Sequence, residues 1–166
     1  MKRYLLYFAL PLIAILLLSS CEKTSQVVPQ YSHLTYITYD NNKINVHSNA
    51  FDANIAYHEY NDGFGIILFE SPVKYINNYA FRSYASLTSV TIPDSVIAIG
   101  EWAFYGCNKL TSVYCQATTP PALGYGAFQM NDSNRIIFVP IESVEAYKKA
   151  QGWRDYADRI LGLKFD

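Results

Sequence analysis

The chain has 166 residues, of which 51% are hydrophobic and 16% are charged. Lys and Arg (13) nearly balance Asp and Glu (14), so the sequence lacks the basic footprint that a nucleic-acid-binding surface needs. Its 15 tyrosines and 9 phenylalanines exclude a disordered chain and predict one small folded domain behind an N-terminal leader.

The first 20 residues are typical of an export signal. Lys2 and Arg3 precede an uncharged apolar run over residues 4–18, which is shorter than the roughly 20 residues that a membrane-spanning helix needs. The run ends in LSSC at residues 18–21, which resembles the lipobox of bacterial lipoproteins. We therefore expect a lipoprotein signal peptide over residues 1–20; the alternative is an ordinary signal peptide followed by a chance cysteine.

The lipobox resemblance implies that cleavage leaves Cys21 as the first residue and that its thiol is diacylated. Several acyl chains on one residue anchor a protein stably in a membrane. Residues 21–33 would then hold the lipidated cysteine and a polar tether. The expected location is the cell envelope, on the outer membrane or cell surface of a Gram-negative bacterium.

Residues 34–63 are predicted to form an N-terminal hairpin cap. Two alternating segments, 34–39 and 43–46, flank Asp40-Asn41-Asn42, whose side chains tolerate left-handed turns. The pattern predicts that these two segments pair as a β-hairpin.

Residues 64–140 contain an internal repeat. The segment INNYAF at 76–81 recurs as IGEWAF at 99–104, and LTSV at 87–90 recurs at 110–113, both with an offset of 23 residues. A third copy, LGYGAF, follows at 123–128. One unit is too small to bury its own apolar side, so we expect neighbouring units to stack and share a core.

The unit at residues 87–107 reads LTSVTIPDSVIAIGEWAFYGC. It resembles the BspA-like branch of bacterial leucine-rich repeats, whose consensus is close to LxSVxIPxSVxxIGxxAFxxC. The resemblance implies a β-rich α/β fold, a right-handed leucine-rich-repeat solenoid, here with about three 23-residue coils. It also implies a surface-anchored lipoprotein that binds molecules of a host or a neighbouring cell.

Residues 141–166 are predicted to form a C-terminal helical cap. Pro140 ends a strand, and residues 142–151 carry glutamates early and lysines late, with Gly152 behind them, as a helix prefers. The segment resembles the C-terminal cap of BspA-like lipoproteins. The alternative is that it binds a partner helix.

The sequence shows no catalytic or metal-binding constellation. It has no Gly-x-Ser-x-Gly elbow, glycine-rich phosphate loop or His-Glu-x-x-His, and its histidines lie far from Cys107 and Cys115. These two cysteines could pair as a disulfide, or Cys107 could pack in the core at a repeated apolar position. We expect no enzyme activity, no cofactor and no metal, with a hydrolase of unfamiliar type as a distant rival.

The candidate ligand face follows from strand alternation. If Val90 and its neighbours point inward, four residues of adjacent units point outward. Nearby outward positions are apolar and could either extend this face or be covered by the ends of the chain. The candidate residues are Ser89, Thr91, Ser112 and Tyr114, and their apolar neighbours are Ile66, Leu68, Ile136 and Phe138.

The function expected from these features is that of a non-catalytic, surface-exposed binding or adhesion lipoprotein. It would present its repeat face to a host protein, a glycan or a neighbouring cell, with a membrane contact through the lipid anchor and no nucleic-acid partner. The alternative is a small scaffold subunit of a cell-envelope complex.

Overall fold

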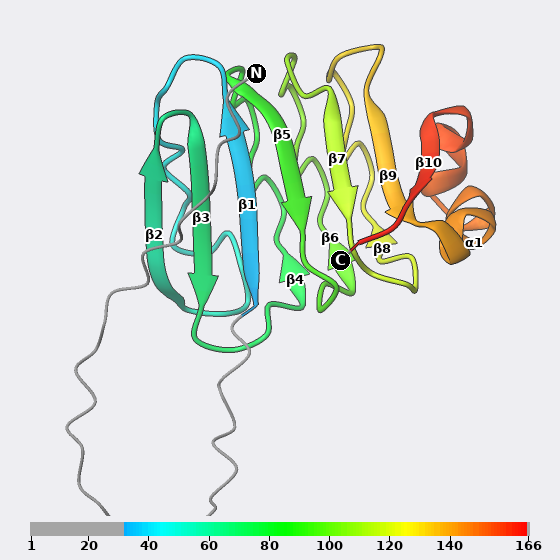
Figure 1. Ribbon diagram of the computed structural model, residues 1–166, viewed down its shortest axis with the longest axis horizontal. Coiled ribbons are helices and arrows are strands. Elements are labelled where there is room, and N and C mark those ends of the chain that lie inside the picture. The colour runs from blue at the N-terminus through cyan, green and yellow to red at the C-terminus, as the bar shows by residue number, and fades with distance from the viewer. Residues whose placement is uncertain (1–31, 166) are drawn as a thin grey trace, which may run out of the picture.

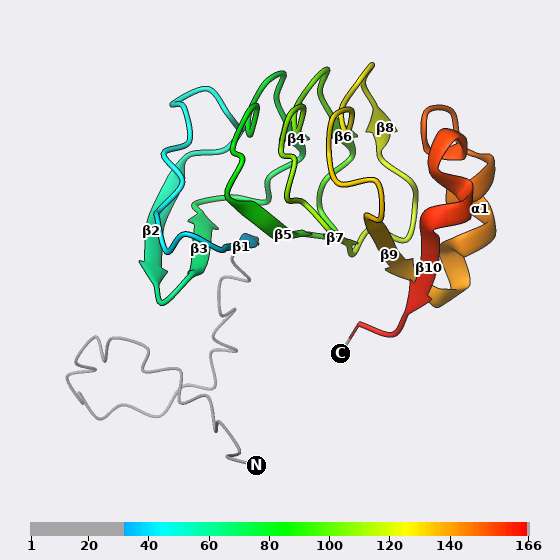
Figure 2. The ribbon, with the colours of Figure 1, turned by 90° about the horizontal axis from the view of Figure 1, so that it is seen from above.

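A computed structural model describes residues 32–165 of the chain (Figure 1). The signal peptide, Cys21 and most of the predicted tether lie outside that range. Two β-sheets lie on opposite sides of a common core, and the helices stand at the C-terminal end of the molecule (Figure 2). In the part of the chain that the structure describes, no helix is long and apolar enough to cross a membrane.

The larger sheet has seven strands in the order β10-β9-β7-β5-β1-β3-β2 (Figure 1). Strands β5, β7, β9 and β10 are parallel, whereas β1 is antiparallel to both of its neighbours and β2 is antiparallel to β3. The strands span β1 (His33–Thr38), β2 (Ile55–Asn61), β3 (Phe64–Phe69), β5 (Leu87–Ile92), β7 (Ser112–Cys115), β9 (Ile136–Pro140) and β10 (Ile160–Leu163).

The smaller sheet has three short parallel strands, β4 (Tyr75–Ile76), β6 (Ala98–Ile99) and β8 (Ala122–Leu123). Each repeat unit therefore supplies one strand to each sheet. The predicted 23-residue register is confirmed in both: Val90 pairs with Val113, and Ile76 pairs with Ile99. The resulting fold is the strand-rich α/β arrangement that the sequence predicts.

A column of aromatic rings runs through the core. Phe104 stacks between Phe81 and Phe128, with ring centres 4.9 and 5.2 Å away, and all three side chains are buried. Phe51 lies beyond Phe81 at 5.9 Å, and Trp153 lies beyond Phe128 at 6.0 Å. The repeated phenylalanine thus joins the units through one continuous apolar contact.

The predicted hairpin between residues 34–39 and 43–46 is wrong. The first segment does form a strand, β1, but residues 43–46 form none. Strand β1 lies between β3 and β5, so both of its edges are already hydrogen-bonded and residues 43–46 have no edge to pair with. Ile44 is nevertheless buried, and its N–H donates to the Tyr36 hydroxyl at 3.3 Å.

The hairpin at this end of the molecule is formed by β2 and β3 instead. They are joined by Asp62 and Gly63, which both have positive φ, at 46° and 85°. Asp-Gly is a preferred dipeptide for a two-residue hairpin turn because such turns need positive φ.

The C-terminal segment is less helical than predicted. In place of one helix over residues 142–151 there is a 3₁₀ turn at Ile141–Ser143, a short helix α1 (Val144–Lys149) and a second 3₁₀ segment at Trp153–Arg159. Gly152 separates the helical segments with φ 79°, as its predicted role requires. Strand β10, which the sequence analysis did not predict, then pairs in parallel with β9.

Candidate functional site

The four predicted face residues lie together on the outer side of the seven-stranded sheet. Ser89 pairs with Ser112, and Thr91 pairs with Tyr114, across the parallel strands β5 and β7. All four side chains are half-buried, whereas the alternate residues of both strands are buried in the core. The geometry assumed for the predicted face is therefore present.

The sequence analysis missed the residues that flank this face on β1. Thr35 lies beside Thr91, and Ile37 lies beside Ser89, because β1 is inserted between β3 and β5. The same insertion moves Ile66 out of the predicted row: it pairs with Thr35 and so aligns with Thr91. A long-range insertion of this kind leaves no signal in the repeat period.

The outer side of the sheet is apolar and almost free of charge. Glu59 is the one acidic residue in its seven strands, which hold no lysine or arginine. Ile37 is 44% exposed and Phe64, paired with it, is 41% exposed. The Tyr114 ring stacks on Phe138 with ring centres 4.8 Å apart. An uninterrupted surface of this kind suits contact with another molecule.

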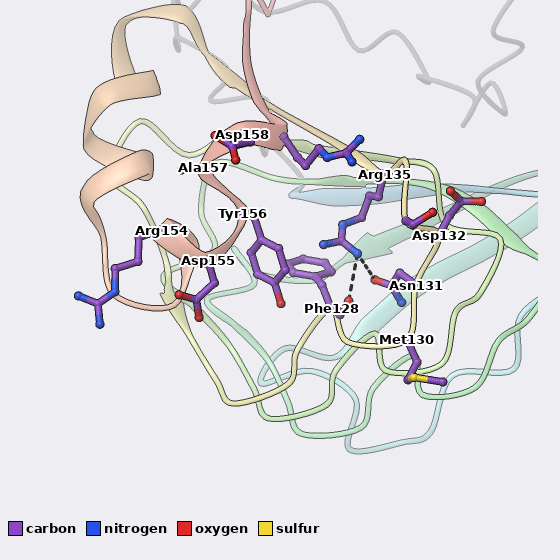
Figure 3. A pocket seen from close by; sticks show the side chains of 12 residues that line it. Phe128, Met130, Asn131, Asp132, Arg135, Arg154, Asp155, Tyr156, Ala157 and Asp158 are labelled. Atoms are coloured by element: carbon purple, nitrogen blue, oxygen red, sulfur yellow. Dashed lines mark hydrogen bonds between the residues drawn. The ribbon is translucent and has the colours of Figure 1, made fainter.

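A hollow of about 310 Å³ lies where the last repeat unit meets the C-terminal segment (Figure 3). Arg135 is buried there, between the rings of Phe128 and Tyr156, with its guanidinium carbon 5.3 and 4.8 Å from the two ring centres. Burial lowers the pKa of Arg135 from its ordinary value. In the described part of the chain its Nε atom has no hydrogen-bond partner.

The contacts of Arg135 have a structural explanation. In successive units the Cys107 thiol donates to the Phe81 carbonyl at 3.0 Å, and the Asn131 amide donates to the Phe104 carbonyl at 2.7 Å. Arg135 Nη1 donates to the Phe128 carbonyl at 3.0 Å, so it supplies the next donor of this series. The arginine thus completes a repeating hydrogen bond at the last unit.

The two cysteines of the repeats are free and buried, so the core position predicted for Cys107 is confirmed over the disulfide. Burial raises the pKa of the Cys107 thiol to about 12 and that of Cys115 to about 11. The Tyr147 hydroxyl donates to Cys115 Sγ at 3.2 Å. Neither thiol has the lowered pKa that a nucleophilic cysteine needs.

Residues 32–165 contain no group of three His, Cys, Asp or Glu side chains that could hold a metal ion. Within the same range, the one histidine with a resolved shift is His58, whose pKa falls to about 4 through burial and the nearby Lys43. Its Nε2 atom lies 2.8 Å from the hydroxyl of buried Tyr36, which fixes strand β2 against β1. These contacts are structural.

Comparison with protein families gives one finding. The family model described as BspA type leucine-rich repeat region, in six copies, matches residues 53–150, which is more than half of the chain. No curated protein matches the sequence.

Proposed function

Because the chain belongs to the BspA-type leucine-rich repeat family, whose repeats generally mediate protein binding, we propose that it is a non-catalytic binding protein. The binding surface in this proposal is the outer side of the seven-stranded sheet, centred on Thr91 and Tyr114. The ligand is a protein of a host or a neighbouring cell.

The observation that carries the proposal is the apolar and nearly uncharged character of that surface. A partner with a complementary apolar patch would cover Ile37, Phe64 and the stacked pair of Tyr114 and Phe138. Tyrosine suits such a contact because it offers a large, rigid area with a hydrogen-bonding hydroxyl.

The proposal has a finer structural part. The repeat units form a right-handed solenoid of about three coils, a form that exposes its core at both ends unless these are covered. Strand β1 and the β2–β3 hairpin cover the front end, and the helical segments with β10 cover the back end. Sheet order and burial of Trp153 support this assignment.

Removing the Tyr114 ring tests the binding surface. Tyr114→Ala should weaken capture of the protein ligand more than tenfold without lowering the melting temperature, because the ring is half-buried on the outside of the sheet. The purified lipoprotein is immobilised and exposed to host matrix proteins and to envelope extract of the producing cells.

The matched control is Tyr125→Ala, which removes a 68% exposed tyrosine outside the sheet and should leave capture unchanged. Equal binding by the Tyr114→Ala variant and the unaltered protein would contradict the proposed surface. A ligand found only in the producer's own envelope would favour the scaffold-subunit alternative.

The location in the cell envelope is also part of the proposal, and it depends on the LSSC sequence at residues 18–21. Mass spectrometry of the mature protein should find Cys21 as the first residue, with acyl chains attached. Cys21→Ala should release the protein from the membrane fraction, because several acyl chains on one residue are what anchor it. An unmodified chain beginning elsewhere, or a variant still held in membranes, would contradict the lipid anchor.

A further inference from the structure

A second, exposed row of aromatic residues follows the turns after β4, β6 and β8. The rings of Tyr79 and Trp102 stack with centres 5.4 Å apart, and Tyr125 stands almost perpendicular to Trp102 at 5.9 Å. Tyr79 is 40% and Tyr125 is 68% exposed, so this row does not belong to the core. It lies outside the seven-stranded sheet and is separate from the surface proposed above.

Two of these rings are held on an unfavourable backbone. Tyr79 has φ 63° and Trp102 has φ 50°, whereas the equivalent position of the third unit is Gly126, at φ 66°. Positive φ is unusual for bulky residues and free of steric cost for glycine. Strain of this kind, retained at an exposed position, points to a function for the side chain.

The third unit is adapted to the indole of Trp102. A Cβ atom added at Gly126 would lie 2.7 Å from both Cδ1 and Nε1 of the indole. The indole therefore lies directly against bare backbone at Gly126, and Tyr125 provides the ring that Gly126 cannot.

A polar rim surrounds these rings. The guanidinium carbon of Arg82 lies 5.4 Å from the centre of the Tyr79 ring and 5.5 Å from that of Tyr105. Between residues 32 and 165, no carboxylate lies within ion-pair distance of Arg82. Together with Gln129, these residues and the aromatic row line an open hollow of about 400 Å³.

We propose that this hollow binds a sugar unit of a glycan. A hexopyranose has an apolar C–H face and a rim of hydroxyls. The C–H face would stack on Tyr125 in the corner that it forms with Trp102, and the hydroxyls would bond to Arg82 and Gln129. Ligand sites commonly combine apolar and aromatic walls with a few polar groups that set orientation.

The test uses the two tryptophans of the chain, because Trp153 is buried and Trp102 is only half-buried. The full chain, in a detergent without a sugar headgroup, is titrated with mannan, laminarin, xylan, pectin, chitin oligosaccharides and heparin. At least one of these glycans should shield Trp102 from acrylamide quenching and retard the protein in an affinity gel.

Two variants locate the site. Trp102→Gly and Tyr125→Ala should each weaken retardation at least tenfold, and Tyr114→Ala, on the sheet, should leave it unchanged. Trp102→Gly relieves the positive φ, so its melting temperature should not fall and loss of binding cannot be ascribed to unfolding.

The proposal is overturned if no glycan of the panel binds, or if binding survives both Trp102→Gly and Tyr125→Ala. It is also overturned if a proline-rich peptide shields Trp102 and none of the glycans does. None of these outcomes bears on capture of a protein ligand by the sheet, since Tyr114→Ala reports on that surface separately.

Discussion

Phe104→Ala should destabilise the protein by about 3–5 kcal/mol, as truncation of a buried aromatic ring generally does. Phe104 is the middle ring of the core column and has no exposed surface. Its loss would leave a cavity between Phe81 and Phe128, which its ring separates at 4.9 and 5.2 Å. Urea unfolding, followed by the fluorescence of the buried Trp153, measures the change.

The control for this variant is Tyr105→Ala, which removes the neighbouring ring from the half-buried side of the same turn. That change should cost far less, because most of the lost ring contacts are with solvent or Arg82. Unfolding of Phe104→Ala at the same urea concentration as the unaltered protein would show that the rings do not form the core.

Gly65→Ala should cost about 3 kcal/mol, at the upper end of the range of about 1–3 kcal/mol for overpacking a core. Gly65 is buried on β3 and pairs with Tyr36 of β1 on one side and with Tyr60 of β2 on the other. A Cβ atom at this position would overlap the ring of Tyr36. The variant therefore tests the insertion of β1 beside β3, measured by the same urea unfolding.

A double-mutant cycle with Tyr36→Ala separates this clash from a general intolerance of β3 to alanine. Once the Tyr36 ring is gone, the added methyl group meets open space, so Gly65→Ala should cost much less in that background. An equal cost in both backgrounds would contradict the packing of Tyr36 over Gly65 and the strand order that produces it.

The repeat made part of the fold predictable, because a fixed offset in sequence becomes a fixed register in a parallel sheet. The pairings of Val90 with Val113 and of Thr91 with Tyr114 follow from the offset of 23 residues. The place of β1 could not be found in this way. Its alternating pattern predicts a strand but does not say which edges are free, and that depends on tertiary packing.

The candidate surface was predictable to a similar extent. Alternation placed Ser89 and Ser112 on the outer side of the sheet, whereas Ile37 joined them only through the insertion of β1. The exposed row beginning at Tyr79 escaped the sequence analysis because its rings depend on positive φ values. The Asp62-Gly63 turn, by contrast, carried a local signal that could have identified the β2–β3 hairpin.

The most direct test of protein binding by the outer side of the sheet is photo-cross-linking on living cells. A photoreactive amino acid replaces Tyr114, and in a matched variant it replaces Lys149, whose side chain is 80% exposed on α1. The cells are irradiated alone and in contact with host cells. The account predicts a discrete cross-linked protein from position 114 and none from position 149; no adduct at position 114, or the same adducts at both positions, would contradict it.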